Sequence, residues 1–345
     1  MRRLLCYLSL SLFITTLSAQ NEVDTLRIVS YNTENLFDCK HDSLKNDYDF
    51  TPEGCYHWTL DKYKKKIANV ARVITSIGQW DSPILIGLCE IENEKVLIDL
   101  TRYSPLKNLN YKFIHAESPD KRGVDVALLY QPKQFKPIKN EFIKISFPDD
   151  PQSKTRDILY TVGKLPNGDT LHVFVNHFPS RLGGEVASEE KRVYVASVLR
   201  AKIDSIRTSS PKANILIMGD FNDYPNNKSI EITLGAKKPV EPINSSNLYN
   251  LFYQFQEQGI IGSNKYNGEW GMLDQIIVSG SMLLPNNRIY TNQNNAHICE
   301  ESFLLEDDNR FMGKKPFRTY IGMKYHGGYS DHLPVYINLI LKNNK

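Results

Sequence analysis

The sequence predicts an α/β fold: a four-layer sandwich in which two mixed, mostly antiparallel β-sheets pack face to face with helices on the outside. Runs such as ILIGL (84–88) and ILIM (215–218) are apolar at successive positions, which is typical of strands buried on both faces. Other segments alternate apolar and polar residues, as half-buried strands do. Amphipathic helical stretches lie between them, and no internal repeat divides the chain.

The first half of the chain alternates between the two kinds of element. Apolar residues recur at helical spacing after residue 60, as Ile67, Val70, Ala71 and Ile74 show. We therefore expect helices over 61–78 and 93–103, and strands over 26–32, 83–90, 111–117, 123–131 and 142–147. The basic run 62–66 on the first helix is interpreted as a solvated face.

The second half continues the pattern. A PNGD turn at 166–169 predicts a hairpin between two strands. The expected strands are 157–165, 170–178, 214–222, 273–279 and 334–342, and a helix is expected over 188–207. Two long loops, 38–58 and 299–328, complete the chain, and loops of this length are often functional.

The N-terminus has the composition of a secretory signal peptide. Arg2 and Arg3 precede a short apolar run, and small residues follow up to Ala19. We expect cleavage after Ala19, so that residues 1–19 form the signal peptide, residues 20–345 form one domain, and the protein is secreted or periplasmic. The apolar run is too short to span a membrane, and no other segment predicts a span.

The net charge and the cysteine content exclude few classes of function. The formal net charge is +3, and Arg2 and Arg3 contribute two of these charges, so the remaining chain is near neutrality and net charge does not indicate a polyanionic partner. Cys39 and Cys55 flank a polar loop that a disulfide could close in an oxidising compartment, whereas Cys89 follows an apolar run and is expected to be a buried thiol. No cysteine spacing matches a zinc site.

Polar side chains gather where the expected strands begin or end. The strands that end in such residues supply Asn32, Glu90, Asn176, His177, Asp220 and Asn222, and those that begin with them supply Asp125, Asp274, Asp331 and His332. If the two groups of strands run antiparallel, all of these side chains meet at one edge of the sandwich. Carboxylates crowded in this way need a cation, an imidazolium or raised pKa values. The alternative, that each residue only caps a turn, does not explain so regular a match to strand ends.

Seven motifs in order carry a resemblance to the endonuclease/exonuclease/phosphatase superfamily, and the chain is similar to pancreatic deoxyribonuclease-like, secreted bacterial-type members. They are SYNTENLF, LCEIEN, RGVDVALLY, NHFPSR, GDFND, GMLDQIIVS and YSDHLPV, and they span Ser30 to Val335. The resemblance implies the sandwich fold, a divalent metal and hydrolysis of phosphoric esters.

The resemblance also implies where the metal and the phosphate bind. Glu90 is expected to hold the metal, with Asp331 and Asn32, and hard oxygen ligands suit Mg²⁺ or Mn²⁺. The residues expected at the phosphate are Asn32, Asn176, Asn222 and Arg181. For Arg181, simple surface exposure remains an equal alternative.

The expected catalytic residues are Asp220, a dyad of Asp274 with His332, and His177. Family members pair the second histidine with a carboxylate on a neighbouring strand, and Asp125 is the candidate for that role. In this chain Asn176 and His177 are adjacent, whereas the nuclease motif separates them by one residue. Which histidine acts as acid and which as base stays open.

The sequence therefore predicts a secreted phosphodiesterase that depends on Mg²⁺ or Mn²⁺, and a nuclease acting on DNA or RNA is the first hypothesis. The alternative is a phospholipid or sugar-phosphate phosphodiesterase or phosphatase of the same fold, similar to sphingomyelinases. A binding protein without catalysis is disfavoured because the full set of expected catalytic residues is present. Oligomeric state and an additional Ca²⁺ site stay open.

Overall fold

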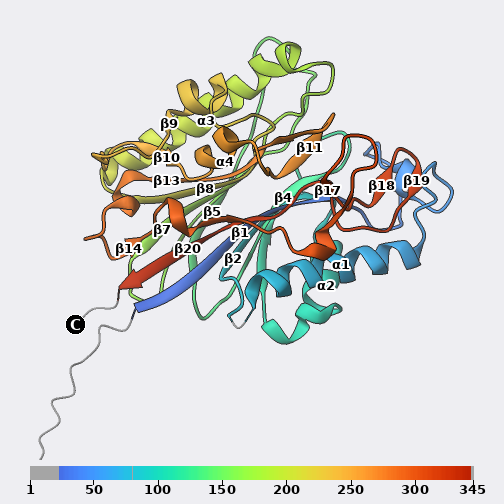
Figure 1. Cartoon of the computed structure of the whole chain (residues 1–345), viewed down its shortest axis with the longest axis horizontal. Coiled ribbons are helices and arrows are strands. Elements are labelled where there is room, and N and C mark those ends of the chain that lie inside the picture. The colour runs from blue at the N-terminus through green and yellow to red at the C-terminus, as the bar shows by residue number, and fades with distance from the viewer. Residues whose placement is uncertain (1–22, 80, 343–345) are drawn as a thin grey trace, which may run out of the picture.

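The computed structural model describes residues 23–79 and 81–342. The expected signal peptide lies outside these residues. Two seven-stranded sheets face each other, and helices cover the outer face of each (Figure 1). This arrangement confirms the predicted four-layer sandwich.

The first sheet contains both ends of the described chain. Its strands are β1 (Val23–Leu36), β2 (Leu85–Ile91), β3 (Lys112–His115), β4 (Asp125–Tyr130), β14 (Ile289–Tyr290), β15 (Ala296–Ile298) and β20 (Val335–Lys342). They run in the order β14-β20-β1-β2-β4-β3, and β15 also pairs with β20. Only β1 and β2 are parallel in this sheet; its other pairs among the described residues are antiparallel.

The second sheet carries most of the middle of the chain. Its strands are β5 (Lys136–Ile143), β6 (Ile158–Lys164), β7 (Thr170–His177), β8 (Asn214–Asp220), β9 (Ala236–Lys237), β10 (Leu248–Asn250) and β13 (Asp274–Ser279). Their order is β5-β6-β7-β8-β13-β10-β9. The pairs β7–β8 and β9–β10 are parallel and the other pairs of this order are antiparallel, so both sheets are mixed, as predicted.

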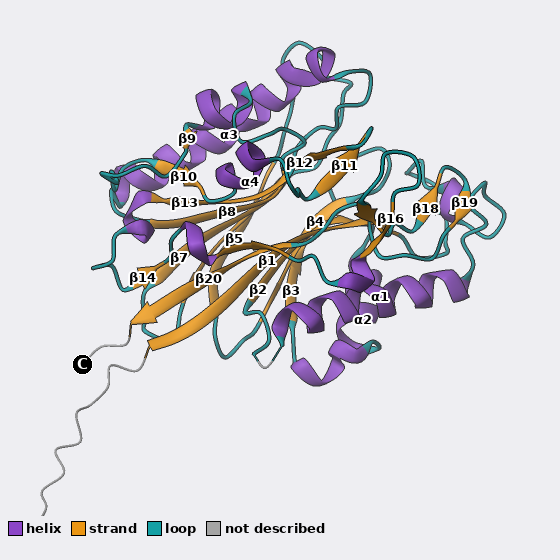
Figure 2. Ribbon diagram, in the orientation of Figure 1, coloured by secondary structure: helices purple, strands orange, loops and turns teal. Residues whose placement is uncertain are grey.

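The helices lie on the two outer faces (Figure 2). They are α1 (Leu60–Gly78) and α2 (Glu94–Arg102) beside the first sheet, α3 (Glu185–Ser209) on the second sheet, and the short α4 (Tyr253–Gln258) after β10. Asn93 caps α2, because its side chain accepts a hydrogen bond from the Val96 N–H at 3.0 Å. Within the described residues, no helix is long and apolar enough to cross a membrane.

Strands of the second sheet are buried on both faces, as the apolar runs predicted. In β8, Leu216 and Met218 belong to the core between the sheets, whereas Ile215 and Ile217 belong to a second core beneath α3. Because side chains alternate along a strand, a run of apolar residues fills two cores at once. Packing on both faces therefore holds these strands between the other sheet and the outer helix.

The structure corrects several local predictions. The strand expected over 142–147 is β5, which ends at Ile143, because Ile143 pairs with Ile158, the first residue of β6. The loop 299–328 contains two small hairpins, β16 (Leu305–Asp307) with β17 (Lys314–Pro316) and β18 (Tyr320–Ile321) with β19 (Lys324–Tyr325). Another hairpin pairs β11 (Asn264–Tyr266) with β12 (Glu269–Gly271).

The cysteines and the basic run complete these corrections. Cys39 and Cys55 are free thiols, so the disulfide that could have closed their loop is absent, and Cys89 is buried as expected. Lys66 is also buried, although we interpreted the run 62–66 as a solvated face.

Candidate active site

The polar strand ends of the second sheet lie next to one another. His177 pairs with Asp220 across the parallel strands β7 and β8, and Asp220 pairs with Asp274 across the antiparallel strands β8 and β13. From the first sheet, the Asn32 side chain donates a hydrogen bond to Asp220 Oδ2 at 3.0 Å. The two sheets therefore contribute to one polar edge, which confirms the convergence that their opposite strand directions predicted.

Gly219 allows the close approach of β7 and β8 at this edge. A Cβ atom there would lie 1.9 Å from the carbonyl oxygen of Asn176, and the residue has φ +143°. No other residue avoids this overlap without moving one strand. Gly219 therefore sets the separation of the strand ends that carry His177 and Asp220.

Bulges turn the neighbouring ends of β1 and β2 toward the same edge. The β1–β2 register shifts between Asn32 and Leu36, and Glu90 has a positive φ of 64°. Positive φ in a residue with a side chain is strained, and such residues cluster at functional sites. The Asn35 N–H donates to Glu90 Oε2 at 2.8 Å, which holds the carboxylate in place.

His332 is held by Asp274. The distance from His332 Nδ1 to Asp274 Oδ2 is 2.6 Å, and both side chains are buried. Burial works to lower the pKa of His332, but Asp274, Asp331 and Asp220 outweigh it and raise the pKa well above its usual value. His332 is therefore an imidazolium near neutral pH, and Asp274 fixes its orientation. The predicted dyad is confirmed as a contact.

A tight loop presents this histidine. A Cβ atom at Gly328 would lie 2.2 Å from the carbonyl oxygen of Phe317, so the loop passes its neighbour at backbone contact. Ser330 then donates to the Asn32 carbonyl at 2.7 Å, and its Oγ accepts the His332 N–H at 3.0 Å. These contacts tie the C-terminal motif to the end of β1.

His177 differs from His332 in charge. Its Nε2 lies 3.6 Å from Asp220 Oδ2 and 3.9 Å from Glu90 Oε1. Burial lowers the pKa of His177 well below its usual value, and the charges of Arg156 and Arg122 lower it further. Burial also raises the pKa of Asp220 to about 7, although His332 works in the opposite direction. The edge thus holds one neutral and one cationic imidazole beside a carboxyl group that titrates near neutrality.

The oxygen donors fit a hard divalent cation. Among the described residues, hydrogen bonds use Oε2 of Glu90 and Oδ2 of Asp331, and leave Oε1 and Oδ1 of these carboxylates without one. Oδ1 of Asn32 accepts the Glu34 N–H at 3.0 Å. Carboxylate oxygens are the donors that Mg²⁺ and Mn²⁺ prefer. Glu90 and Asp331 therefore offer suitable ligand atoms, while the amide of Asn32 is already engaged by neighbouring groups.

Two charged residues near Asp331 did not emerge from the sequence. Arg318 Nη2 donates to Asp331 Oδ2 at 3.0 Å, and its Nε contacts the buried Glu34 at 3.3 Å. Lys66 donates to the carbonyl of Tyr329 at 2.6 Å and lies 4.0 Å from Glu34. Burial lowers the pKa of Lys66 to about 8, although Glu34 and Asp331 oppose that shift.

A sequence signal for Lys66 did exist. Lys66 follows Tyr63 by three residues and precedes Val70 by four, which places it on the apolar face of α1. Glu34 lies within the quoted SYNTENLF motif, two residues beyond Asn32. Arg318 lies in the loop 313–328, whose mixture of Lys, Arg and Tyr suits contact with a nucleic-acid backbone but did not indicate a contact with Asp331.

The expected pairing of Asp125 with His177 is wrong. Asp125 Oδ2 lies instead 3.4 Å from His115 Nε2, and the carboxylates in ion-pair contact with His177 are Glu90 and Asp220. Asp125 begins β4, which is hydrogen-bonded to β3, whereas His177 ends a strand of the other sheet. His177 is instead contacted by Glu90 from the first sheet and by Asp220 from the second, and motif order alone did not reveal these partners.

Three expected phosphate ligands have contacts within the protein. Asn176 is fully buried and donates to the Met218 carbonyl at 3.3 Å, and Asn222 donates to the Phe178 carbonyl at 3.0 Å. Arg181 donates to the Asn222 carbonyl at 2.8 Å and to Glu185 at 3.1 Å. Arg181 thus braces the loop after β8, and its phosphate contact stays a prediction.

A small cavity adjoins this edge. It has a volume of about 220 Å³, and its lining includes Glu34, Asn35 and Arg318 together with the rings of Phe50, Tyr56 and Tyr320. Asn35 also contacts Glu90, so the cavity begins beside the candidate metal ligand. Its lining combines aromatic and polar side chains, and its volume suits a single ring.

Comparisons with known proteins identify the family and the fold of this chain. The sequence model of the Endonuclease/Exonuclease/phosphatase family matches residues 27–341. A search of curated proteins finds no match.

Solved structures share the fold at low identity. D. rerio TDP2 complexed with single strand DNA product is 16% identical with a TM-score of 0.54, covering 91% of this chain and 98% of its own. A mannosyl-6-phosphatase from Bacteroides thetaiotaomicron is 15% identical with a TM-score of 0.55, covering 91% and 99%. The human Nocturnin catalytic domain with bound sulfate anion is 15% identical with a TM-score of 0.52, covering 92% and 96%. With the family match over nearly all described residues, the chain belongs to the endonuclease/exonuclease/phosphatase family of metal-dependent phosphoric-ester hydrolases.

Proposed function

We propose that the chain is a secreted phosphodiesterase that cleaves nucleic acid with the help of Mg²⁺ or Mn²⁺. The observation that carries the proposal is the charge pattern of the buried edge. His177 lies 3.6 Å from Asp220 and 3.9 Å from Glu90, and His332 lies 4.0 Å from Asp331. The lowered pKa of His177 and the raised pKa of His332 favour a neutral and a charged imidazole at this edge. Hydrolysis of an anionic ester needs charge neutralisation, a base for the attacking water and a proton donor. Glu90 and Asp331 would hold a neutralising cation, Asp220 can act as the base, and His332 can act as the proton donor.

Each protein group has a distinct task in this proposal. A bound divalent cation would neutralise phosphoryl charge. His332, oriented by Asp274, donates a hydrogen bond to a phosphoryl oxygen or a proton to the leaving oxygen. Asp220, with a pKa of about 7, accepts a proton from the attacking water. The Asn32 amide holds Asp220 and thereby orients that base.

Nucleic acid is the favoured substrate because a base can stack in the aromatic cavity while its phosphate lies at the polar edge. The structural resemblance to TDP2 with single strand DNA product is consistent with such a substrate. The same cavity favours one alternative, a sugar-phosphate ester, since a monosaccharide ring also packs on aromatic faces. The resemblance to a mannosyl-6-phosphatase supports that second candidate.

One parallel assay tests both candidates. The purified protein is incubated with Mg²⁺ and single-stranded DNA, supercoiled plasmid, RNA, sphingomyelin or a hexose 6-phosphate, and released product is measured. We expect the highest kcat/KM for a nucleic acid and its loss in His332→Ala. Preference for the hexose phosphate would establish the alternative, and activity on none of these esters would overturn the proposal. The proposed secretion is tested separately by expressing the full chain in a bacterium and locating the processed protein.

A further inference from the structure

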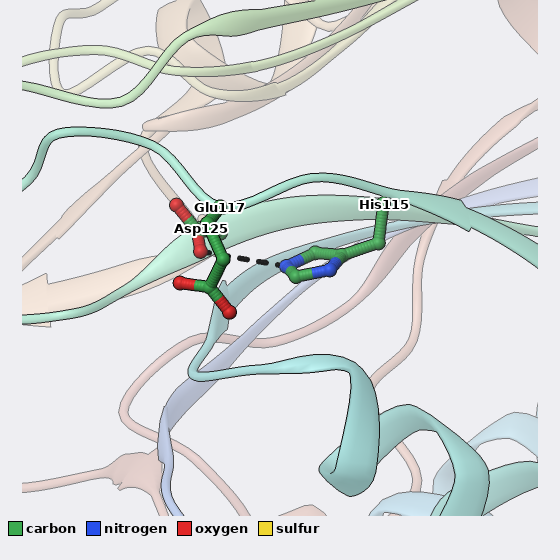
Figure 3. Close-up of side chains that lie close together, drawn as sticks. All are labelled: His115, Glu117 and Asp125. Carbon is green, nitrogen blue, oxygen red and sulfur yellow. Dashed lines mark ion pairs between the residues drawn. The ribbon is translucent and has the colours of Figure 1, made fainter. Parts of the chain in front are cut away.

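A second group of metal-binding side chains lies on the hairpin of β3 and β4. We call His115, Glu117 and Asp125 the hairpin cluster. Their ligand atoms all lie within 4.8 Å of one another, and the side chains converge from the end of β3, the following loop and the start of β4 (Figure 3). The catalytic proposal uses none of the three.

Two buried atoms of the hairpin cluster have no hydrogen-bond partner among the described residues. They are Nε2 of His115 and Oδ2 of Asp125, which face each other at 3.4 Å. The exposed fractions of the two side chains are 3% and 1%. Buried polar atoms are nearly always hydrogen-bonded, so an ion pair that makes no hydrogen bond has free ligand atoms for a cation.

The separation matches a shared metal ion. Bonds of about 2.0–2.2 Å from zinc to nitrogen and oxygen place two ligands of a tetrahedron about 3.4 Å apart. That value equals the distance between His115 Nε2 and Asp125 Oδ2. It is too long for a good hydrogen bond, which would bring the two atoms to about 2.8 Å. The geometry therefore fits two ligands of one cation better than it fits a hydrogen-bonded pair.

The surroundings favour a cation over a second protein partner. The other oxygen of Asp125, Oδ1, accepts the Ser118 N–H at 2.9 Å, which fixes the carboxylate while leaving Oδ2 directed at His115. The nearby Lys45 donates to the carbonyls of Ser118 and Asp120 at 2.7 and 3.1 Å, so its ammonium group is engaged by backbone oxygens. The carboxylates of Glu117 and Asp125 approach each other beside His115. A divalent cation would relieve their repulsion.

We propose that the hairpin cluster binds a divalent transition-metal ion, with Zn²⁺ the best match. One imidazole and two carboxylates form a donor set that suits zinc, whereas the oxygen donors of the active site suit Mg²⁺. Three protein ligands leave a fourth position for water. His115 and Glu117 also line a surface hollow, and Glu117 is solvent-exposed, so an ion can reach the site. The three residues differ from those expected to hold the catalytic metal, and the site does not depend on the proposed substrate.

Zinc binding to the purified full chain in excess Mg²⁺ tests the proposal. The magnesium occupies the oxygen-rich active site, and zinc is titrated by isothermal calorimetry and then counted by elemental analysis after gel filtration. We expect one bound equivalent, an increase in the melting temperature on zinc addition, and a four-coordinate visible spectrum when Co²⁺ replaces zinc. No zinc bound under these conditions overturns the proposal.

Matched variants locate the ion. His115→Asn should weaken zinc binding about 100-fold or more and abolish the cobalt spectrum, since one of three ligands is lost. His326→Asn is the control, because His326 contacts the single carboxylate of Glu306 at 2.5 Å outside the cluster. If His115→Asn does not fold, Glu117→Gln at the exposed position replaces it. Retention of zinc by these hairpin variants, with its loss in His332→Asn, would place the ion in the active site and reject the hairpin site.

Discussion

The active-site edge and the hairpin cluster each place a buried histidine beside a carboxylate, but the chain assembles them in opposite ways. The first joins residues from strands of both sheets, as Asn32, Asp220 and Asp274 show, whereas the second lies between residues 115 and 125. Asp274 is hydrogen-bonded to His332 at 2.6 Å, while Asp125 and His115 are 3.4 Å apart without a hydrogen bond. The distant residues form a preorganised pair and the neighbouring residues leave room for an ion. In this chain, a short separation in sequence does not bring a histidine and a carboxylate into a hydrogen bond.

The largest expected effect comes from removing metal. Exhaustive treatment with a chelator should abolish phosphodiester hydrolysis, because Glu90 and Asp331 then face the substrate phosphate without a cation. Mg²⁺ alone should restore the rate, since the active-site donors are oxygens. Hydrolysis of a fluorescent dinucleotide ester measures both steps. Full activity in the chelated protein would contradict the metal role of Glu90.

Alanine at each histidine separates the two clusters. His332→Ala should lower kcat about 10³-fold, because it removes both the positive charge and the proton donor at the phosphate. His177→Ala should also lower kcat by orders of magnitude. The kcat of His115→Ala should remain at least tenfold higher than that of His332→Ala, as measured by steady-state kinetics on folded protein. Equal losses of kcat in His115→Ala and His332→Ala would show that the hairpin cluster takes part in catalysis.

A smaller loss is expected when the histidine remains but its partner changes. Asp274→Asn should reduce kcat about 10²-fold with KM nearly unchanged, because the imidazole loses the carboxylate that orients it and stabilises its charge. Steady-state kinetics measures both constants. A change confined to KM would show that Asp274 serves substrate binding instead.

The smallest effect is expected from Lys66, which supports the loop of His332 without belonging to the catalytic set. Lys66→Ala removes a buried ammonium group that holds the Tyr329 carbonyl, so the loop carrying His332 shifts and kcat should fall about tenfold. Lys65→Ala, one residue away on the exposed side of α1, is the matched control. Zinc binding at the hairpin cluster should be unaffected in both variants. Equal kcat values for the two lysine variants would contradict the supporting role of Lys66.

Much of the fold could be predicted because its signals are local. The runs around Ile86 and Ile217 indicated strands with two buried faces, and the structure places them in the two central layers. The polar residues at strand ends could be placed on a common edge because strand direction alone determines that edge. The specific contact of Asp274 with His332 was implied by the family resemblance, and the hydrogen bond from Asn32 to Asp220 was not predicted.

Partners across the sandwich could not be predicted in the same way. Asp125 and Glu90 both lie at expected strand ends of the first sheet, yet Glu90 contacts His177 and Asp125 contacts His115. The sequence does not show which side chains meet across the two sheets. The end of β5 at Ile143 likewise depends on where its partner β6 begins. Arg318 is positioned by a long loop whose conformation has no periodic signal. These errors share one cause, since each depends on contacts between segments that are remote in sequence.

The pairing of β1 with β20 has a consequence for synthesis. The first described strand lies between β2 and the last strand, with Val23 opposite Lys342 and Ser30 opposite Val335. A nascent chain that lacks residues beyond 334 leaves the edge of β1 open and cannot seat the loop that Ser330 ties to Asn32. Residues up to the end of β20 must therefore be synthesised before the loop that carries His332 can be seated against β1.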